Sequence, residues 1–259
     1  MIDDSTLHLF GLPIRNMSLP EASAALVKAA AEGARRQVFF VNAHCVNVAA
    51  RDRGYLDTLR AADLLYADGS GMRLAARLAG QPLHDNVNGT DLFPLLCREA
   101  AASGVGIALL GARPGIAERC ADNMRSRFPG LKVVWTHHGY LNNAEGPALI
   151  SSLNESGARL LLVAMGVPAQ EVWIARHAGA LRIPVLLGVG ALFDFYSGEV
   201  SRAPAFMRKL GLEWGYRLLL EPRRMFARYM LGNPVFVGRA LVRRMRGQET
   251  LRHAALIGD

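Results

Sequence analysis

The sequence has few cysteines, and their spacing does not suit a structural role. Only Cys45, Cys97 and Cys120 occur among its 259 residues, with no CxxC pair and no histidine pair at the separation of metal ligands. This pattern argues against a zinc site and a disulfide framework, and a reduced, cytoplasmic setting is expected.

An apolar run long enough to span a membrane is also lacking, and a secretory leader is not expected. The longest apolar run, at residues 160–169, is about half of the roughly 20 residues that a bilayer-spanning helix needs. The first residues, MIDDSTLHLF, are acidic and carry no basic start followed by an apolar core. With 51% hydrophobic and 20% charged residues, the chain has an ordinary globular composition.

Charge is distributed unevenly along the chain. Residues 1–200 hold 18 basic and 18 acidic residues, whereas residues 201–259 hold 12 basic and only 4 acidic ones, so the whole excess of +8 lies in this tail. We therefore predict two regions, a catalytic or binding domain over 1–200 and an appendage over 201–259.

The tail interleaves its arginines with large apolar residues such as Phe206, Trp214 and Leu219. This mixture suits a helix that lies on an anionic membrane surface. The alternative is that the apolar residues pack on the main domain and the arginines face solvent. No nucleic-acid-binding motif is present, and the apolar share is high for a surface that follows phosphates, so nucleic acid is not an expected partner.

Short apolar runs alternate with helical patterns over the first 200 residues. This alternation predicts a doubly wound α/β domain with a mainly parallel sheet covered on both faces. The expected strands are 37–41, 64–67, 105–111, 131–135, 159–165 and 183–189, and the expected helices are 19–34, 46–62, 115–128 and 169–181.

Glycine and polar residues follow these expected strands, where parallel sheets bind ligands. The residues concerned are Asn42, Asp68, Gly111 to Gly115, Gly166 to Glu171 and Gly188 to Asp194. Neither GxGxxG nor GxxxxGK[ST] is present, which disfavours a dehydrogenase or an ATPase. Without a DxD-like motif or clustered acids at strand ends, no metal ion or other cofactor is expected.

Several motifs, taken in order, resemble one enzyme family. VNAHCVN, ADGSGM, NGTDL, LLGARPG, MGVPAQE, GVGALFDFYSG, RAP and GLEWGYRLLLEPRR are similar to successive blocks of the WecG/TagA/CpsF glycosyltransferases, over roughly residues 37–230. The resemblance implies a Rossmann-like core and inverting transfer of a sugar from a UDP-sugar to a polyprenyl-diphosphate-linked saccharide. It also implies peripheral association with the inner face of a bacterial cell membrane, in exopolysaccharide or other surface-glycan synthesis.

The resemblance also implies site residues. Asp68 matches the proposed general base of the family, although an aspartate before Gly69 is equally good chemistry for a helix cap or turn. Asn42 and Gln170 match further pocket positions and are grouped with Asp68 as catalytic, but each has the alternative of satisfying loop backbone groups. His44 is expected to be a structural hydrogen-bonder.

The remaining matched positions are expected to bind substrate. Asp194 either bonds a ribose or orders its loop, and Asp91 either lines the pocket or caps the helix that follows it. In the tail, two arginines match family residues that face diphosphates, while Glu213 and Glu221 have the alternative of pairing with them. The expected substrate-binding set is Gly111, Gly166, Glu171, Gly188, Gly190, Asp194, Asp91, Arg217 and Arg224.

Two positions depart from the family pattern. Asn86 stands where many members have an arginine, and Phe40 stands where some have a threonine. Donor and acceptor choice therefore stay open, with UDP-glucose, UDP-N-acetylmannosamine and its uronic acid as alternatives. The resemblance is slightly greater to the glucosyltransferases. A non-catalytic membrane-binding module is the alternative from another class. The sequence does not settle the oligomeric state; a homo-oligomer is one alternative.

Overall fold

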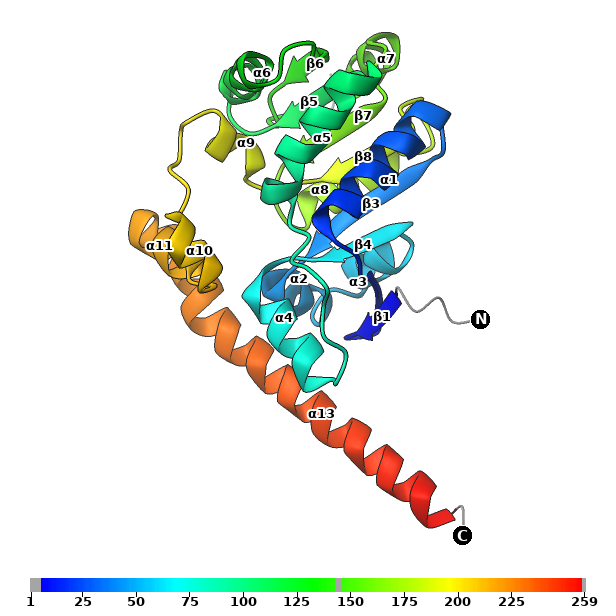
Figure 1. Cartoon of the computed structure of the whole chain (residues 1–259), viewed down its shortest axis with the longest axis vertical. Coiled ribbons are helices and arrows are strands. Elements are labelled where there is room, and N and C mark those ends of the chain that lie inside the picture. The colour runs from blue at the N-terminus through cyan, green and yellow to red at the C-terminus, as the bar shows by residue number, and fades with distance from the viewer. Residues whose placement is uncertain (1–5, 143–145, 258–259) are drawn as a thin grey trace.

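A computed structural model describes residues 6–142 and 146–257, with side chains up to residue 245 except at positions 205, 209 and 224. Within these residues, eight strands form one sheet in the order β1-β2-β4-β3-β8-β7-β5-β6 (Figure 1). All neighbours are parallel except β1 and β2, which form an antiparallel hairpin at one edge. The strands are β1 (Thr6–Leu9), β2 (Leu12–Arg15), β3 (Arg36–Val41), β4 (Leu64–Ala67), β5 (Ile107–Gly111), β6 (Val133–His137), β7 (Leu160–Ala164) and β8 (Val185–Gly188).

Helices cover both faces of this sheet, as expected for a doubly wound fold. Along β3, Val38 and Phe40 face one apolar core, and Phe39 and Val41 face the other. One face carries α1 (Leu19–Glu32), α5 (Gly89–Ser103), α6 (Ile116–Arg127) and α9 (Leu192–Tyr196). The other carries α2 (Ala43–Ala49), α3 (Arg53–Arg60), α4 (Gly69–Leu78), α7 (Gly146–Glu155) and α8 (Ala169–His177). The predicted α/β class is confirmed.

Two local predictions differ from the structure. The expected helix 46–62 is two helices, because the Asp52 side chain accepts a hydrogen bond from Tyr55 N (3.0 Å) and begins α3 there. The β1–β2 hairpin was not predicted. It adds two strands beside β4 and widens the sheet.

The tail after residue 200 is helical, as predicted. It contains α10 (Ala205–Lys209), α11 (Glu213–Leu220), α12 (Pro222–Phe226), the π-helical turn η1 (Ala227–Leu231) and α13 (Gly232–Ile257). The first part of α13 packs on the main domain. Phe236 and Ala240 are buried there, and Asn47 Nδ2 donates to Gly232 O (2.7 Å). The tail thereby runs alongside α2 and α4, the helices that follow β3 and β4 (Figure 1). A boundary at residue 200 stays a prediction.

Candidate active site

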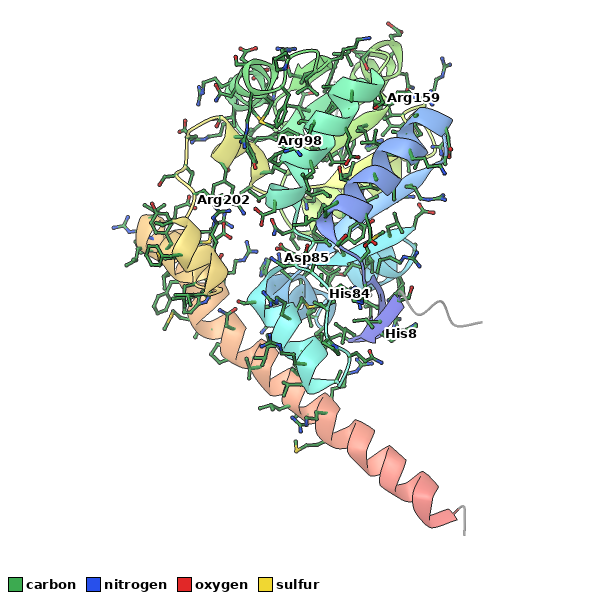
Figure 2. The ribbon with its side chains drawn as sticks, viewed as in Figure 1. His8, His84, Asp85, Arg98, Arg159 and Arg202 are labelled. Carbon is green, nitrogen blue, oxygen red and sulfur yellow. The ribbon has the colours of Figure 1, made fainter. Side chains whose placement is uncertain are left out.

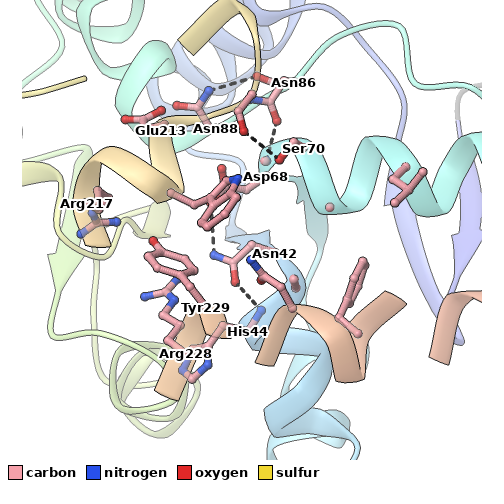
Figure 3. Close-up of a pocket in the computed structure, with 18 of the residues that line it drawn as sticks. Asn42, His44, Asp68, Ser70, Asn86, Asn88, Glu213, Arg217, Arg228 and Tyr229 are labelled. Atoms are coloured by element: carbon pink, nitrogen blue, oxygen red, sulfur yellow. Dashed lines mark hydrogen bonds between the residues drawn. The ribbon is translucent and has the colours of Figure 1, made fainter. Parts of the chain in front are cut away.

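A cavity of about 410 Å³ lies beyond the carboxyl ends of β3 and β4. Its floor comes from the starts of α2 and α4, and its walls come from the start of α5 and from the tail (Figure 3). Polar and charged side chains around it are Asn42, His44, Asp68, Ser70, Asn86, Asn88, Thr90, Arg208, Glu213, Arg217, Arg228, Tyr229 and Asn233.

Asp68 sits on this floor, directly after the last residue of β4. Its backbone N–H donates to Val41 O (2.8 Å), which continues the parallel pairing of β3 and β4 by one residue and fixes the position of the side chain. One carboxylate oxygen accepts a hydrogen bond from Asn42 Nδ2 (3.2 Å). The carboxylate is thus held on two rigid strands at the cavity.

The side chain of Asp68 does not act as the helix cap that was its alternative role. Asp68 occupies the N-cap position of α4, yet its side chain makes no capping hydrogen bond. Asn86 supplies the acceptor instead, because its Oδ1 accepts from Gly69 N (2.6 Å). An amide from a neighbouring loop caps the helix, and the carboxylate of Asp68 remains available to the cavity.

Burial raises the pKa of Asp68 above its usual value. The hydrogen bond from Asn42 and the charges of Arg228 and Arg217 act in the opposite direction, while the nearby Glu213 carboxylate adds to the rise. A carboxylate with a raised pKa is a stronger base at neutral pH than one in water.

Asn42 serves both the backbone and the carboxylate. Its Oδ1 caps α2 by accepting from His44 N (3.0 Å) and Cys45 N (3.2 Å), so its Nδ2 must point away, toward Asp68. The structure thus shows the backbone role left open for Asn42 and adds a bond to Asp68, while its role toward a substrate stays a prediction.

Two arginines from the tail face Asp68 across the cavity. Arg217 stacks over the Phe195 ring, 5.2 Å from its centroid, and Arg228 lies 5.7 Å from the centroid of Tyr229. His44 adds no positive charge at neutral pH, because burial and the neighbouring Arg228 lower its pKa to about 4. Guanidinium groups held on aromatic rings can bind phosphate oxygens in a fixed geometry.

Gln170 lies away from this cavity and is buried. Its Oε1 accepts from Gly166 N (3.2 Å) and Gly190 N (2.8 Å), and its Nε2 donates to Glu171 Oε1 (2.8 Å). It therefore ties together the loops that follow β7 and β8, which is the alternative role left open for it. Glu171 is fully buried too, and burial raises its pKa to about 7.

The glycines expected at a nucleotide also serve close packing. A Cβ on Gly111 would lie 2.3 Å from Ala164 O, and a Cβ on Gly188 would lie 3.1 Å from Gln170 Nε2. None of the described residues that line the 410 Å³ cavity comes from the loops directly after β5, β7 and β8. Their role toward a donor stays a prediction.

Asp91 anchors the tail and does not line the cavity. It pairs with Arg202 (2.7 Å) and Arg208 (3.5 Å), which precede α11, and Arg202 lies between the sheet and α10 in Figure 2. Burial alone would raise the pKa of Asp91, but hydrogen bonds from Arg202 and Asn88 lower it below the usual value. The cap of α5 is Asn88, whose Oδ1 accepts from Asp91 N (2.8 Å), so the cap predicted at Asp91 is wrong by three residues.

Asp194 and Arg224 complete the expected set. The backbone oxygen of Asp194 accepts from Val200 N (3.0 Å) and Ser197 Oγ (3.2 Å), so this residue helps to order the turn after α9. The side chain of Arg224 lies outside the described residues.

Comparison with known proteins decides the family. The model of the "Glycosyl transferase WecG/TagA/CpsF family" matches residues 7–250. The chain belongs to this family. It is a glycosyltransferase, and the resemblance carried by the sequence motifs is confirmed.

Two relatives of this chain are named for a specific glycosyltransferase activity. A Bacillus subtilis (strain 168) protein is 31% identical over 184 residues, which cover 71% of each chain, and it is named N-acetylglucosaminyldiphosphoundecaprenol N-acetyl-beta-D-mannosaminyltransferase. A Staphylococcus aureus (strain NCTC 8325 / PS 47) protein of the same name is 30% identical over 184 residues, covering 71% of this chain and 72% of its own.

The two departures from the family pattern have different surroundings. Asn86 lines the cavity and caps α4, so the change from arginine removes a charge there. Phe40 is buried, 5.9 Å from the Tyr66 ring between centroids, and does not line the cavity.

Sequence reasoning missed several residues of the cavity. Glu213, Trp214, Arg228 and Tyr229 line it from the tail, and Glu213 Oε1 accepts from Arg202 Nε (3.4 Å). Glu213 and Trp214 stand in the GLEWGYRLLLEPRR block, and Glu213 had the alternative of pairing with Arg217 or Arg224, whereas its partner among the described side chains is Arg202. Arg228 and Tyr229 follow this block and carried no signal beyond the composition of the tail.

The described residues contain neither a candidate membrane span nor a candidate metal site. Among them, no helix is both long and apolar enough to cross a membrane. No cluster of three or more His, Cys, Asp or Glu side chains in the described part of the chain is arranged to hold a metal ion.

Proposed function

We propose that this enzyme transfers a sugar from a UDP-sugar, with inversion, to a saccharide linked to polyprenyl diphosphate. The observation that carries the proposal is the carboxylate of Asp68, mounted at the end of β4, released from capping by Asn86 and facing a cavity with two arginines. The names of the relatives supply the acceptor class, an N-acetylglucosaminyl group on diphosphoundecaprenol.

Each group has a defined part in the proposed reaction. An acceptor hydroxyl attacks the anomeric carbon of the donor, Asp68 takes the hydroxyl proton, and the bond to the UDP oxygen breaks with its electron pair leaving on UDP. Arg217 and Arg228 balance the charge of a diphosphate at the cavity. Asn42 keeps the Asp68 carboxylate oriented during proton transfer.

The donor we favour is UDP-N-acetylmannosamine. Both relatives are named for N-acetylmannosaminyl transfer, and nothing comparable supports the glucosyl transfer to which the sequence motifs slightly inclined. Loss of the arginine at position 86 is the feature of this cavity most able to change that preference, because Asn86 lines it.

We also propose that the enzyme works at the inner face of a bacterial cell membrane, in surface-glycan synthesis. The alternative, that the apolar residues of the tail pack on the main domain, holds for Phe236 and Ala240. It fails for much of the segment before α13, whose exposed large apolar residues include Phe206, Leu210, Leu219, Phe226 and Leu231. Together with the basic excess of the tail, such side chains suit an anionic bilayer surface.

A donor panel tests this function. The purified enzyme is incubated with GlcNAc-diphosphate-polyprenol and, separately, UDP-N-acetylmannosamine, its uronic acid, UDP-glucose and UDP-N-acetylglucosamine. We expect UDP release coupled to formation of a disaccharide lipid, highest with UDP-N-acetylmannosamine. Absence of transfer from every donor would refute the proposed function, and highest transfer from UDP-glucose would refute only the choice of donor.

A further inference from the structure

Two helices run side by side away from the candidate active site. Gly71 and Leu74 of α4 line the catalytic cavity together with Phe236 and Val237 of α13. One turn further along both helices, Ala75 and Leu78 of α4 line a second hollow, of about 510 Å³, together with Ala240 and Arg244 of α13. Because residue numbers rise along both helices from the first hollow to the second, α4 and α13 run in the same direction, as Figure 1 shows.

The edge of this seam is apolar. Val237 and Leu241 stand at i, i+4 spacing on α13 and so lie on one face of it. Leu241 is 44% exposed and Leu74, on α4, is 41% exposed. We call Leu74, Leu78, Val237 and Leu241 the seam stripe. Since Leu74 and Val237 also line the catalytic cavity, the stripe begins at the site itself.

Basic side chains stand at both ends of the stripe. Arg217 and Arg228 lie in the catalytic cavity, and Arg77, Arg243 and Arg244 line the second hollow. A ligand that matches this order has an anionic head followed by a hydrocarbon chain, and the chain leaves the protein where basic groups could meet anionic headgroups.

We propose that the seam stripe binds the first isoprene units of the lipid acceptor, next to its diphosphate. This inference rests on the proposed function, which supplies a diphosphate joined to an isoprenoid chain. The apolar stripe then shields hydrocarbon that would otherwise cross water between the cavity and the bilayer. Turnover therefore depends on the chain length of the acceptor through its contacts with α4 and α13, and not through the bilayer alone.

The opposite side of α13 provides a matched control. A groove there is lined by Val46 and Ala49 of α2 and by Val235 and Val242 of α13. Val242 is 43% exposed, close to the value for Leu241, but this groove shares no described lining residue with the catalytic cavity. Apart from Arg239 and Arg243 its lining is apolar, and it lies on the same helix, yet it does not begin at the site.

The test compares two acceptors in detergent micelles, without a bilayer. Both carry GlcNAc-diphosphate, one on a single isoprene unit and the other on several units. The test variant is Leu241→Asn, and the control variant is Val242→Asn, each made in the full chain and checked for an unchanged melting temperature.

We expect the test variant to lower kcat/KM for the long acceptor by about fivefold, the loss expected when one apolar contact weakens. Its kcat/KM for the short acceptor, and both values for the control variant, should stay at wild-type levels. Equal losses on both acceptors would overturn the inference, as would equal losses in both variants. A change in oligomeric state of the test variant alone, by sedimentation, would assign the stripe to a second copy of the chain and overturn it too. If the wild-type enzyme glycosylates neither acceptor, the proposed function itself is refuted. If the wild-type enzyme glycosylates both acceptors equally well, only the binding of isoprene units by the seam stripe is refuted.

Discussion

Replacing Glu171 by glutamine should stabilise the folded enzyme at pH 8. The Glu171 side chain is fully buried, and its Oε2 is also buried with no hydrogen-bond partner within the described residues. Oε1 accepts from Gln170 Nε2 (2.8 Å), a bond that a glutamine oxygen at position 171 can keep. The variant therefore removes a buried charge and leaves the hydrogen bond to Gln170 in place.

The magnitude follows from the pKa. Burial raises the pKa of Glu171 from 4.5 to about 7, so between these values the folded state holds a proton that the unfolded state has lost. Stability contributed by this group is then full below pH 4.5 and falls as pH rises to about 7. At pH 8 the free energy of unfolding lost through ionisation of Glu171 amounts to about 3 kcal/mol, at 1.36 kcal/mol per pKa unit.

Denaturant unfolding between pH 5 and pH 8 measures this effect. We expect Glu171→Gln to exceed wild type in unfolding free energy by about 3 kcal/mol at pH 8 and by much less at pH 5. Glu118→Gln, at an exposed position on α6, is the control and should keep the wild-type pH dependence. If the unfolding free energies of Glu171→Gln and wild type change with pH in the same way, the assignment of a buried charge at this position is refuted.

Three further predictions concern the site and the tail. His44 should show no titration above pH 5 when followed by NMR, because burial and Arg228 lower its pKa to about 4; a midpoint near 6.5 would contradict the buried site. The full chain should sediment with anionic liposomes and be released by high salt, since screening weakens attraction between a basic tail and headgroups; binding to neutral liposomes alone would count against this account. Transfer should persist in EDTA, and complete loss restored by Mg²⁺ or Mn²⁺ would show that a metal takes part.

Most of the sheet was predictable because its strands are continuous apolar runs. Six expected strands occur near their predicted positions, from β3 to β8. The β1–β2 hairpin was missed because each strand has only four residues and mixes polar with apolar ones, as in TLHL and LPIR. The break inside 46–62 depends on a single side-chain cap at Asp52, which hydrophobic periodicity does not report.

The site was predictable only where strand ends mark it. Asp68 and Asn42 follow neighbouring strands, and parallel pairing of β3 with β4 brings them within a hydrogen bond. Gln170 also follows a strand, but its amide points inward to Gly166 and Gly190, a direction that residue type does not reveal. Arg228 reaches the cavity through packing of the tail against α2 and α4, which strand-end reasoning does not address.

The role of Asp68 as base is tested most directly by the turnover of Asp68→Asn. Asp63→Asn is the control, because Asp63 precedes the same strand at its other end, where its Oδ2 accepts from Gln37 N (2.7 Å). We predict that Asp68→Asn lowers kcat by about 10²- to 10⁴-fold while UDP still binds, and that Asp63→Asn keeps wild-type turnover. Turnover of Asp68→Asn within a few-fold of wild type would contradict the account.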